Sequence, residues 1–228
     1  MFKFKELIEL WRTANSLTQA LDDSHEMLAR TQNMFDKSVQ SLRRSDNSDM
    51  DVDIRQMDEA INRYEQQVRH NVLKHLAITG GANLIPGLIL TSIVIDIERI
   101  GDYTKNITDL AVTHPERLRC GQYEAELLKI ETGVGEIFKE IQPTLTKSDA
   151  DAARILMSDH WWILKKCDYL LGEMVKAPDK ALSASDAIAT ALYTRYLKRI
   201  TAHLINIASS VFNPFERIGF REEVEGEK

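Results

Sequence analysis

The sequence predicts an all-α protein built as two tandem three-helix bundles, with a short extra helix at the N-terminus. Turn-forming residues are scarce, because 10 Gly and 5 Pro in 228 residues fall well below the roughly 12% that these two types reach on average. Aromatic residues make up only 7%. A β-sandwich or barrel needs a turn about every 8–12 residues, so this composition favours long helices over many short strands.

The charge balance and the two cysteines narrow the class of protein further. The 29 Lys and Arg against 35 Asp and Glu leave a net charge of −6, whereas a nucleic-acid-binding protein needs a basic surface to neutralise phosphates. We therefore expect no nucleic-acid partner. Cys120 and Cys167 have no CxxC spacing, which is typical of small buried side chains in a reducing cytosol.

We expect neither a signal peptide nor a transmembrane segment. The first residues contain Glu6, and no small-residue cleavage site follows them, unlike a secretory signal. The most apolar stretch, residues 84–95, is shorter than the roughly 20 residues that cross a bilayer. It is expected to form a buried helix at the centre of a bundle.

Apolar residues at helical spacing outline the first half of the chain. Residues 2–11 predict a short amphipathic helix with Phe4, Leu7, Ile8 and Trp11 on one stripe. That stripe either packs on the bundle or contacts a partner or a membrane surface. Longer helices are expected at residues 15–44, 51–78 and 84–112, the last with Asn83 as its N-cap.

The same pattern repeats in the second half. Helices are expected at about 122–145 and 150–176, and a final one, capped by Ser183 or Ser185, runs to about Phe212. The helix-breaking pair His114-Pro115 separates the two sets. The predicted domains are therefore residues 1–114 and 115–228.

An offset of one hundred residues aligns the last helix of each half. Residues 96–108 read DIERIGDYTKNIT and residues 196–208 read YLKRITAHLINIA. The identical pairs are Arg99 and Arg199, Ile100 and Ile200, Asn106 and Asn206, and Ile107 and Ile207. Four identities in this window suggest an internal duplication.

The string Asp96 to Tyr103, DIERIGDY, followed by Asn106-Ile107, strongly resembles the signature helix of the PhoU family. Residues 57–65, MDEAINRYE, are similar to the second-helix pattern of that family. The resemblance covers essentially the whole chain, since PhoU-like proteins are two tandem three-helix repeats. The loop at residues 79–85, TGGANLI, differs from the usual connection in the family.

The resemblance implies a regulator of phosphate uptake, located in the cytoplasm or peripherally at the membrane. Its implied partners are a phosphate transporter or a phosphate-sensing kinase at the inner face of the membrane. The resemblance also implies iron, zinc or another divalent or trivalent metal in the first repeat, with no organic cofactor. Whether the chain forms a homo-oligomer stays an open question.

Five side chains are the candidate metal ligands. Glu98 and Asp102 are four residues apart and so project from one helical face. Asp58, Asn62 and Glu65 form a similar stripe on the preceding helix. Neighbouring carboxylates repel each other unless a proton or a cation lies between them, and a metal with oxygen ligands would relieve that repulsion.

The alternative is that Glu98 pairs with a neighbouring cation on the helix surface, with Arg69 on the preceding helix as a possible partner, and that Asp102 hydrogen-bonds a loop. Arg99 and Arg199 are each expected to form a structural ion pair inside their own bundle, in preference to binding phosphate. In the second repeat, Lys198 and Ala202 occupy the places of Glu98 and Asp102, which argues against a second metal site. Gly101 inside its helix suggests a close helix–helix approach that Thr201 cannot repeat.

The sequence contains no nucleophile motif or phosphate-binding loop, so we expect no catalytic residues and no enzyme. Two other classes of function stay open. One is a metal-dependent hydrolase or redox enzyme built on a helical bundle, and the other is a structural helical protein that oligomerises without metal.

Overall fold

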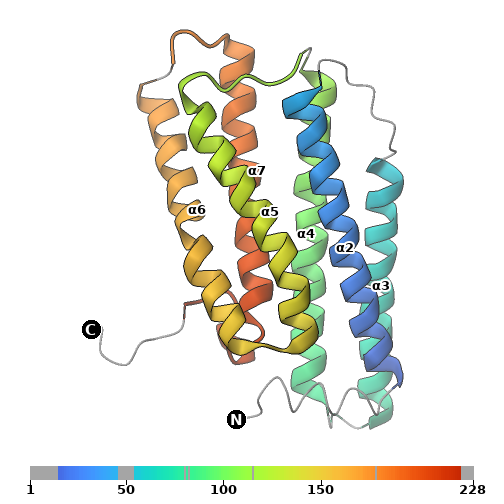
Figure 1. The fold of residues 1–228 in the computed structure, drawn as a ribbon. Coiled ribbons are helices and arrows are strands. Elements are labelled where there is room, and N and C mark those ends of the chain that lie inside the picture. The colour runs from blue at the N-terminus through green and yellow to red at the C-terminus, as the bar shows by residue number, and fades with distance from the viewer. Residues whose placement is uncertain are drawn as a thin grey trace, which may run out of the picture.

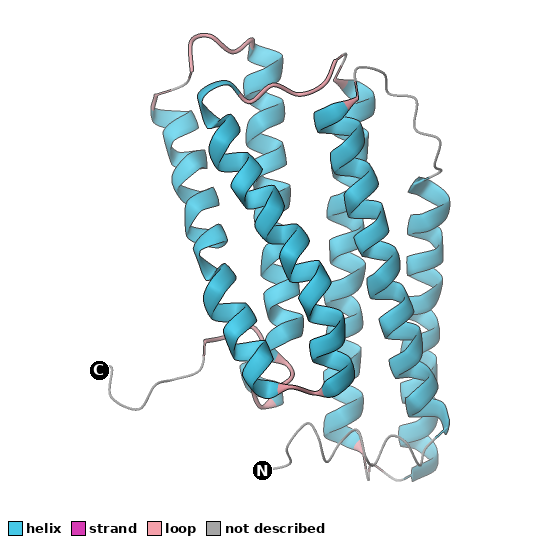
Figure 2. Ribbon diagram, in the orientation of Figure 1, coloured by secondary structure: helices cyan, strands magenta, loops and turns pink. Residues whose placement is uncertain are grey.

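Six long α-helices form the part of the chain that the computed structural model describes, residues 15–45, 54–79, 81, 83–114, 116–177 and 179–221 (Figure 1). Loops and two short 3₁₀ turns connect them, and no strand occurs in these ranges (Figure 2). The predicted all-α class is confirmed. The predicted helix at residues 2–11 lies outside the described residues.

The observed helices follow the predicted segments closely. They are α2 (Asn15–Arg44), α3 (Ile54–Thr79), α4 (Leu84–Thr113), α5 (Glu124–Lys147), α6 (Ala150–Lys176) and α7 (Ala184–Ser209), with 3₁₀ turns at Gly121–Tyr123 and Phe215–Arg217. The end of α7 falls three residues before the expected Phe212. There the chain turns back, and the Gly219 N–H donates to Ser209 Oγ.

Two of the helix starts have a side-chain cap, and the start of α4 does not. The Asp149 carboxylate accepts from Ala152 N–H at the start of α6, and the Ser183 hydroxyl accepts from Asp186 N–H at the start of α7. Asn83 precedes α4, but its side chain makes no capping bond. Its amide is bonded instead to His75 Nε2, 2.9 Å away. Asn83 therefore occupies the predicted N-cap position but does not make the predicted capping bond.

The helices form two sets of three, which pack against each other through α4 and α7 (Figure 1). The helices α2, α3 and α4 pack together, as do α5, α6 and α7. The apolar start of α4 does take a central position, because this helix touches α2, α3 and α7. It is not buried all round, however, since Leu84, Leu88 and Ile95 are 51%, 37% and 37% exposed.

The contact between α4 and α7 reflects the offset of one hundred residues seen in the sequence. Asp96 of α4 meets His203 of α7, and Tyr103 of α4 meets Tyr196 of α7. Adding one hundred to Asp96 gives Tyr196, and subtracting one hundred from His203 gives Tyr103, so each pair converts into the other. The rings of Tyr103 and His203, which are equivalent positions, stack with centroids 5.8 Å apart. Such paired contacts are expected where two copies of one bundle pack about a pseudo-twofold axis.

Gly101 lets α3 approach α4 closely. A Cβ atom there would lie 3.2 Å from Ile61 Cδ1 and 3.8 Å from Thr31 Cγ2. In α7 the equivalent Thr201 is fully buried, and its hydroxyl donates to the Leu197 carbonyl. The two bundles therefore pack differently at this position, as the sequence indicated.

Both cysteines are buried free thiols, as expected. Burial raises the pKa of Cys120 to about 11 and that of Cys167 to about 12. A thiol with such a pKa carries little thiolate at neutral pH and is a poor nucleophile or metal ligand. Among the described residues, no helix combines the length and the apolar character needed to cross a membrane.

Candidate functional site

The five predicted ligands lie on the facing sides of α3 and α4, and we call them the acidic face. Asp58, Asn62 and Glu65 come from α3, and Glu98 and Asp102 come from α4. The contact of Ile61 with Gly101 holds the two helices close at this level. All five side chains are partly buried, so the charges of the four acids are less screened than those of exposed residues.

Lys105 is the residue that joins the two sides of the acidic face. Its Nζ lies 2.9 Å from Asp58 Oδ2 on α3 and 3.1 Å from Asp102 Oδ1 on its own helix. Burial disfavours its charge, but hydrogen bonds to Asp58 and Asp102 outweigh this effect and raise the pKa of Lys105. An ammonium group therefore stands between two of the predicted ligands.

Two arginines pair with other members of the face. Arg69 Nη2 lies 2.8 Å from Glu65 Oε1, four residues earlier on α3. Arg99 Nη1 lies 3.2 Å from Asp102 Oδ2, and Arg99 Nε lies 3.5 Å from Glu98 Oε2. Arg69 thus pairs with Glu65 on its own helix rather than with Glu98, the expected partner. Arg99 reaches both acids of α4 despite its adjacent position in the sequence.

Glu98 is the acid whose charge is least well compensated. Its side chain is 16% exposed, and burial is the largest cause that raises its pKa. The negative charge of Asp102 raises the pKa of Glu98 further, as do Glu65 and Asp58, while Arg99 opposes them. The acids of both helices therefore act on one another electrostatically, as their spacing predicts.

The oxygen donors of the acidic face suit a hard cation, but Lys105 already bonds two of these side chains. Carboxylate and amide oxygens are the ligands of Ca²⁺, Mg²⁺ and Mn²⁺, and carboxylates also bind iron and zinc. In the described part of the chain, no three His, Cys, Asp or Glu side chains are arranged to hold a metal ion. A metal would have to displace Lys105 to bridge the two helices.

Sequence reasoning missed Lys105, although its spacing was informative. It lies three residues after Asp102 and seven after Glu98, which places it on the same helical face. In the second repeat, Lys198 of α7 pairs with Asp168 of α6. This single ion pair occupies the region where an acidic face would otherwise lie in that repeat.

The junction between the repeats is a second polar cluster that sequence reasoning did not find. His203 Nδ1 lies 2.7 Å from Asp96 Oδ1, and Asn206 Nδ2 donates to the same oxygen at 3.0 Å. Arg199 Nε donates to Tyr103 Oη at 3.1 Å, and Arg199 Nη2 lies 3.3 Å from His203 Nε2. His203 and Tyr103 occupy equivalent positions in the two repeats. They predict this cluster only if α4 and α7 are known to pack against each other.

The expected ion pair of Arg199 inside its own bundle is therefore wrong. Its guanidinium lies over the Tyr103 ring, 5.6 Å from the centroid, across the junction. Among the described residues no carboxylate forms an ion pair with it. Because His203 lies between Arg199 and Asp96, the arginine is linked to that acid only through the imidazole.

Part of the chain matches a known family model. Residues 25–111, which carry the acidic face, match the PhoU domain model, so the predicted resemblance is confirmed for this part of the chain. No curated protein sequence matches the chain.

Two solved structures share the fold over most of the chain. The crystal structure of PhoU from Pseudomonas aeruginosa superposes with a TM-score of 0.75 at 22% identity, over 86% of this chain and 95% of that one. The phosphate transport system regulatory protein PhoU from Streptococcus pneumoniae gives a TM-score of 0.62 at 18% identity, over 92% of this chain and 95% of that one. At these identities the likeness establishes the shared fold.

Proposed function

We propose that this chain, whose residues 25–111 match the PhoU domain, is a regulator of phosphate transport. The observation that carries the proposal is this match, which spans α4 and the string ERIGD at residues 98–102. The shared fold of both repeats with a phosphate transport system regulatory protein supports it. The role is that of a helical adaptor and not of a catalyst.

The proposed partners are a phosphate transporter or a phosphate-sensing kinase, contacted at the cytoplasmic face of the membrane. Deletion of the gene in the source organism should uncouple uptake of radiolabelled phosphate from the external phosphate supply, and the wild-type gene should restore the response. Cross-linking in the same cells should recover a transporter or kinase subunit. Uptake that responds normally in the deletion strain would contradict the proposed function.

The acidic face is the proposed metal site. Glu98 and Asp102 would supply carboxylate oxygens from α4, facing Asp58, Asn62 and Glu65 on α3. A bound cation would supply positive charge that offsets the repulsion among these acids. The raised pKa of Glu98, caused by burial and by the neighbouring acids, supports the proposal, and Lys105 is the group with which a metal would compete.

Elemental analysis of the purified protein tests the metal directly. Iron, zinc, manganese or nickel should copurify with the wild type and be lost from the double variant Glu98→Ala/Asp102→Ala. The matched control is Glu136→Ala/Glu140→Ala, which removes two exposed acids at the same spacing on α5. Equal metal content in wild type and both double variants, or none in any of them, would end the metal proposal.

A variant of Lys105 provides a second test, in which metal binding should become tighter. The variant Lys105→Met keeps an unbranched side chain but removes the ammonium between Asp58 and Asp102. Titration with Mn²⁺ should show tighter binding by this variant than by the wild type, because the metal no longer displaces a bonded cation. Identical affinities would mean that the metal binds elsewhere.

Two alternatives give different outcomes. For a metal-dependent hydrolase or redox enzyme, turnover would require metal and disappear in Glu98→Ala. For a structural oligomer, the purified protein would be metal-free, and deletion of the gene would leave phosphate uptake unchanged.

A further inference from the structure

One end of the first repeat exposes an apolar surface. The start of α2, the end of α3 and the start of α4 meet there (Figure 1), since Ser16 Oγ lies 3.2 Å from His75 Nδ1 and the Asn83 amide is bonded to His75 Nε2. Five large aliphatic side chains within two turns of the α3–α4 loop are 37–76% exposed, and we call them the apolar end: Leu73 and Ile78 of α3, and Leu84, Ile85 and Leu88 of α4. Exposed apolar side chains gathered at one place are typical of interaction surfaces.

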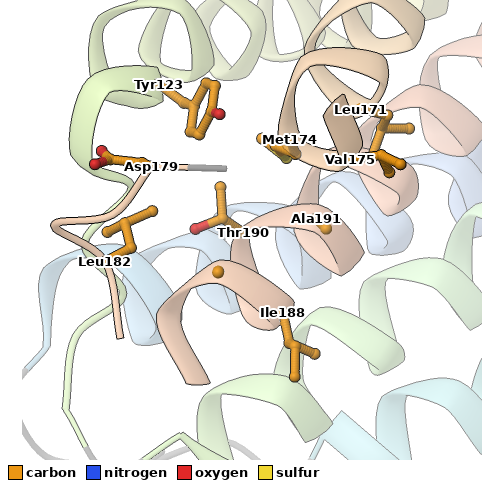
Figure 3. Close-up of a pocket in the computed structure, with 10 residues that line it drawn as sticks. Tyr123, Leu171, Met174, Val175, Asp179, Leu182, Ile188, Thr190 and Ala191 are labelled. Atoms are coloured by element: carbon orange, nitrogen blue, oxygen red, sulfur yellow. The ribbon is translucent and has the colours of Figure 1, made fainter. Parts of the chain in front are cut away.

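The second repeat shows what packs at the corresponding end of its own bundle. The chain that precedes α5 lies against the loop between α6 and α7, because Gln122 N–H donates to Asp179 Oδ2 at 3.0 Å. Tyr123 is only 6% exposed, and its hydroxyl lies 3.5 Å from the Ala177 carbonyl oxygen. Figure 3 shows Tyr123 in the lining of a pocket that Met174 of α6 shares. The segment before the first helix of this repeat therefore packs at the ends of the other two helices.

The side chains at the start of the third helix differ between the repeats. The offset of one hundred residues pairs Leu84 with Ala184 and Ile85 with Ser185. The first repeat thus exposes large aliphatic side chains where the second exposes small ones. This difference predicts a more apolar covering segment for the first repeat than the one that precedes α5.

Residues 2–11 precede the first helix of the first repeat and have the required pattern. Phe4, Leu7, Ile8 and Trp11 recur at helical spacing, and a helix of this length spans about 15 Å. So short a helix is marginal in water by itself, so it needs an apolar surface on which to pack. The few residues between Trp11 and the start of α2 span at most about 13 Å, which keeps the stripe close to the apolar end.

We propose that residues 2–11 form a helix that packs on the apolar end of their own chain. The stripe of Phe4, Leu7, Ile8 and Trp11 covers the five exposed aliphatic side chains. The segment has the role in the first repeat that the turn at Gly121–Tyr123 has in the second. This contact is separate from the acidic face and does not depend on the proposed regulation of phosphate transport.

A nitroxide label on the full-length variant Glu6→Cys tests the contact. Glu6 lies on the opposite side of the predicted helix from the stripe, so the label does not disturb the packing. The native thiols of Cys120 and Cys167 are buried, and their pKa values are raised to about 11 and about 12. The label therefore reacts at the introduced cysteine.

Methyl NMR spectra of the labelled chain report which residues lie near the nitroxide. The resonances of Ile78, Leu84 and Ile85 should broaden. Ile188, the counterpart of Leu88 in the second repeat, lies at the opposite end of the molecule and should keep its intensity. A mixture of nitroxide-labelled chains with separate methyl-labelled chains should show no broadening, because the helix packs on its own chain.

Variants assign the contact to the apolar end. Leu84→Ala/Ile85→Ser gives the first repeat the small side chains of the second, so trypsin should cleave the full chain after Arg12 about tenfold faster than in the wild type. Mass spectrometry follows the release of residues 1–12. The matched control is Leu128→Ala/Ile155→Ser, at positions on α5 and α6 that are 51% and 60% exposed, and it should be cleaved at the wild-type rate.

Several outcomes overturn the proposal. The methyl groups of the apolar end may keep their intensity, Ile188 may broaden equally, or both double variants may be cleaved at the same rate. Broadening in the mixture would identify a second copy of the chain as the occupant. Cleavage after Arg12 that slows only when phosphatidylglycerol vesicles are added would identify a membrane surface instead.

Discussion

Glu98 links the electrostatics of the acidic face to the stability of the protein. Its pKa is raised in the folded state, first by burial and then by Asp102 and the other acids. Folding therefore favours the protonated form, so the ionised carboxylate costs stability above its folded pKa. The cost disappears below the ordinary glutamate pKa of about 4.3, because the group is then protonated in both states.

We accordingly predict that Glu98→Gln raises the free energy of unfolding at pH 7 in metal-free buffer, and that the gain vanishes near pH 4. Urea unfolding at both pH values measures this difference. Glu140→Gln, at an exposed position on α5, should change stability little at either pH. A Glu98→Gln variant that is less stable than the wild type at pH 7 would show that Arg99 outweighs the burial of the acid.

Asp96 is the residue on which the junction between the repeats depends. It is buried, and its Oδ1 is bonded to both His203 and Asn206. Asp96→Ala leaves these two groups without their partner, which should cost about 2–4 kcal/mol. Asp109→Ala, an exposed acid on the same helix, should cost less than about 0.5 kcal/mol.

A double-mutant cycle separates the direct pairing from the burial of each group. Asp96→Ala/His203→Ala should be less destabilising than the sum of the two single changes, by about 1–3 kcal/mol. Additive effects would mean that the two residues stabilise the junction independently.

At the scale of the helix pair, the spacing between α3 and α4 depends on Gly101. Gly101→Val places a branched side chain against Ile61, and overpacking of this kind costs about 1–3 kcal/mol. Gly135→Ala on α5 is the contrasting variant, because nothing lies within 4 Å of its Cβ position. It should stabilise the protein by about 0.5–1 kcal/mol through helix propensity.

Thermal unfolding of both glycine variants measures these opposite effects. Adding Ile61→Ala to Gly101→Val should recover part of the loss, since the smaller side chain makes room for valine. A Gly101→Val protein as stable as the wild type would show that α3 can move away without cost.

For the molecule as a whole, the α4–α7 contact determines whether the two repeats unfold together. Buried residues from both helices, among them Ile93, Ile97, Leu197 and Ile200, belong to one hydrophobic core. We predict one calorimetric transition for the full chain, with equal calorimetric and van't Hoff enthalpies. Two separated transitions would instead favour independent domains divided at the predicted boundary between residues 114 and 115.

Local signals in the sequence were sufficient to predict the helices and the acidic stripe on each of α3 and α4. Helical periodicity is a property of neighbouring residues, so it located six helices within a few residues of their observed ends. The i, i+4 spacing likewise placed Glu98 and Asp102 on one face without any knowledge of packing. The end of α7 was misjudged because the return of the chain onto Ser209 is a tertiary contact.

Local sequence patterns were enough to predict the all-α class, the division into two sets of three helices and the acidic stripes of α3 and α4. The partner of each polar side chain became known only from the packing of the helices. It placed Lys105 between Asp58 and Asp102 and brought Asp96 to His203 across the junction. The reason is physical: helix formation depends on residues within one or two turns, whereas the partners of a buried charge or hydroxyl come from helices far apart in the chain.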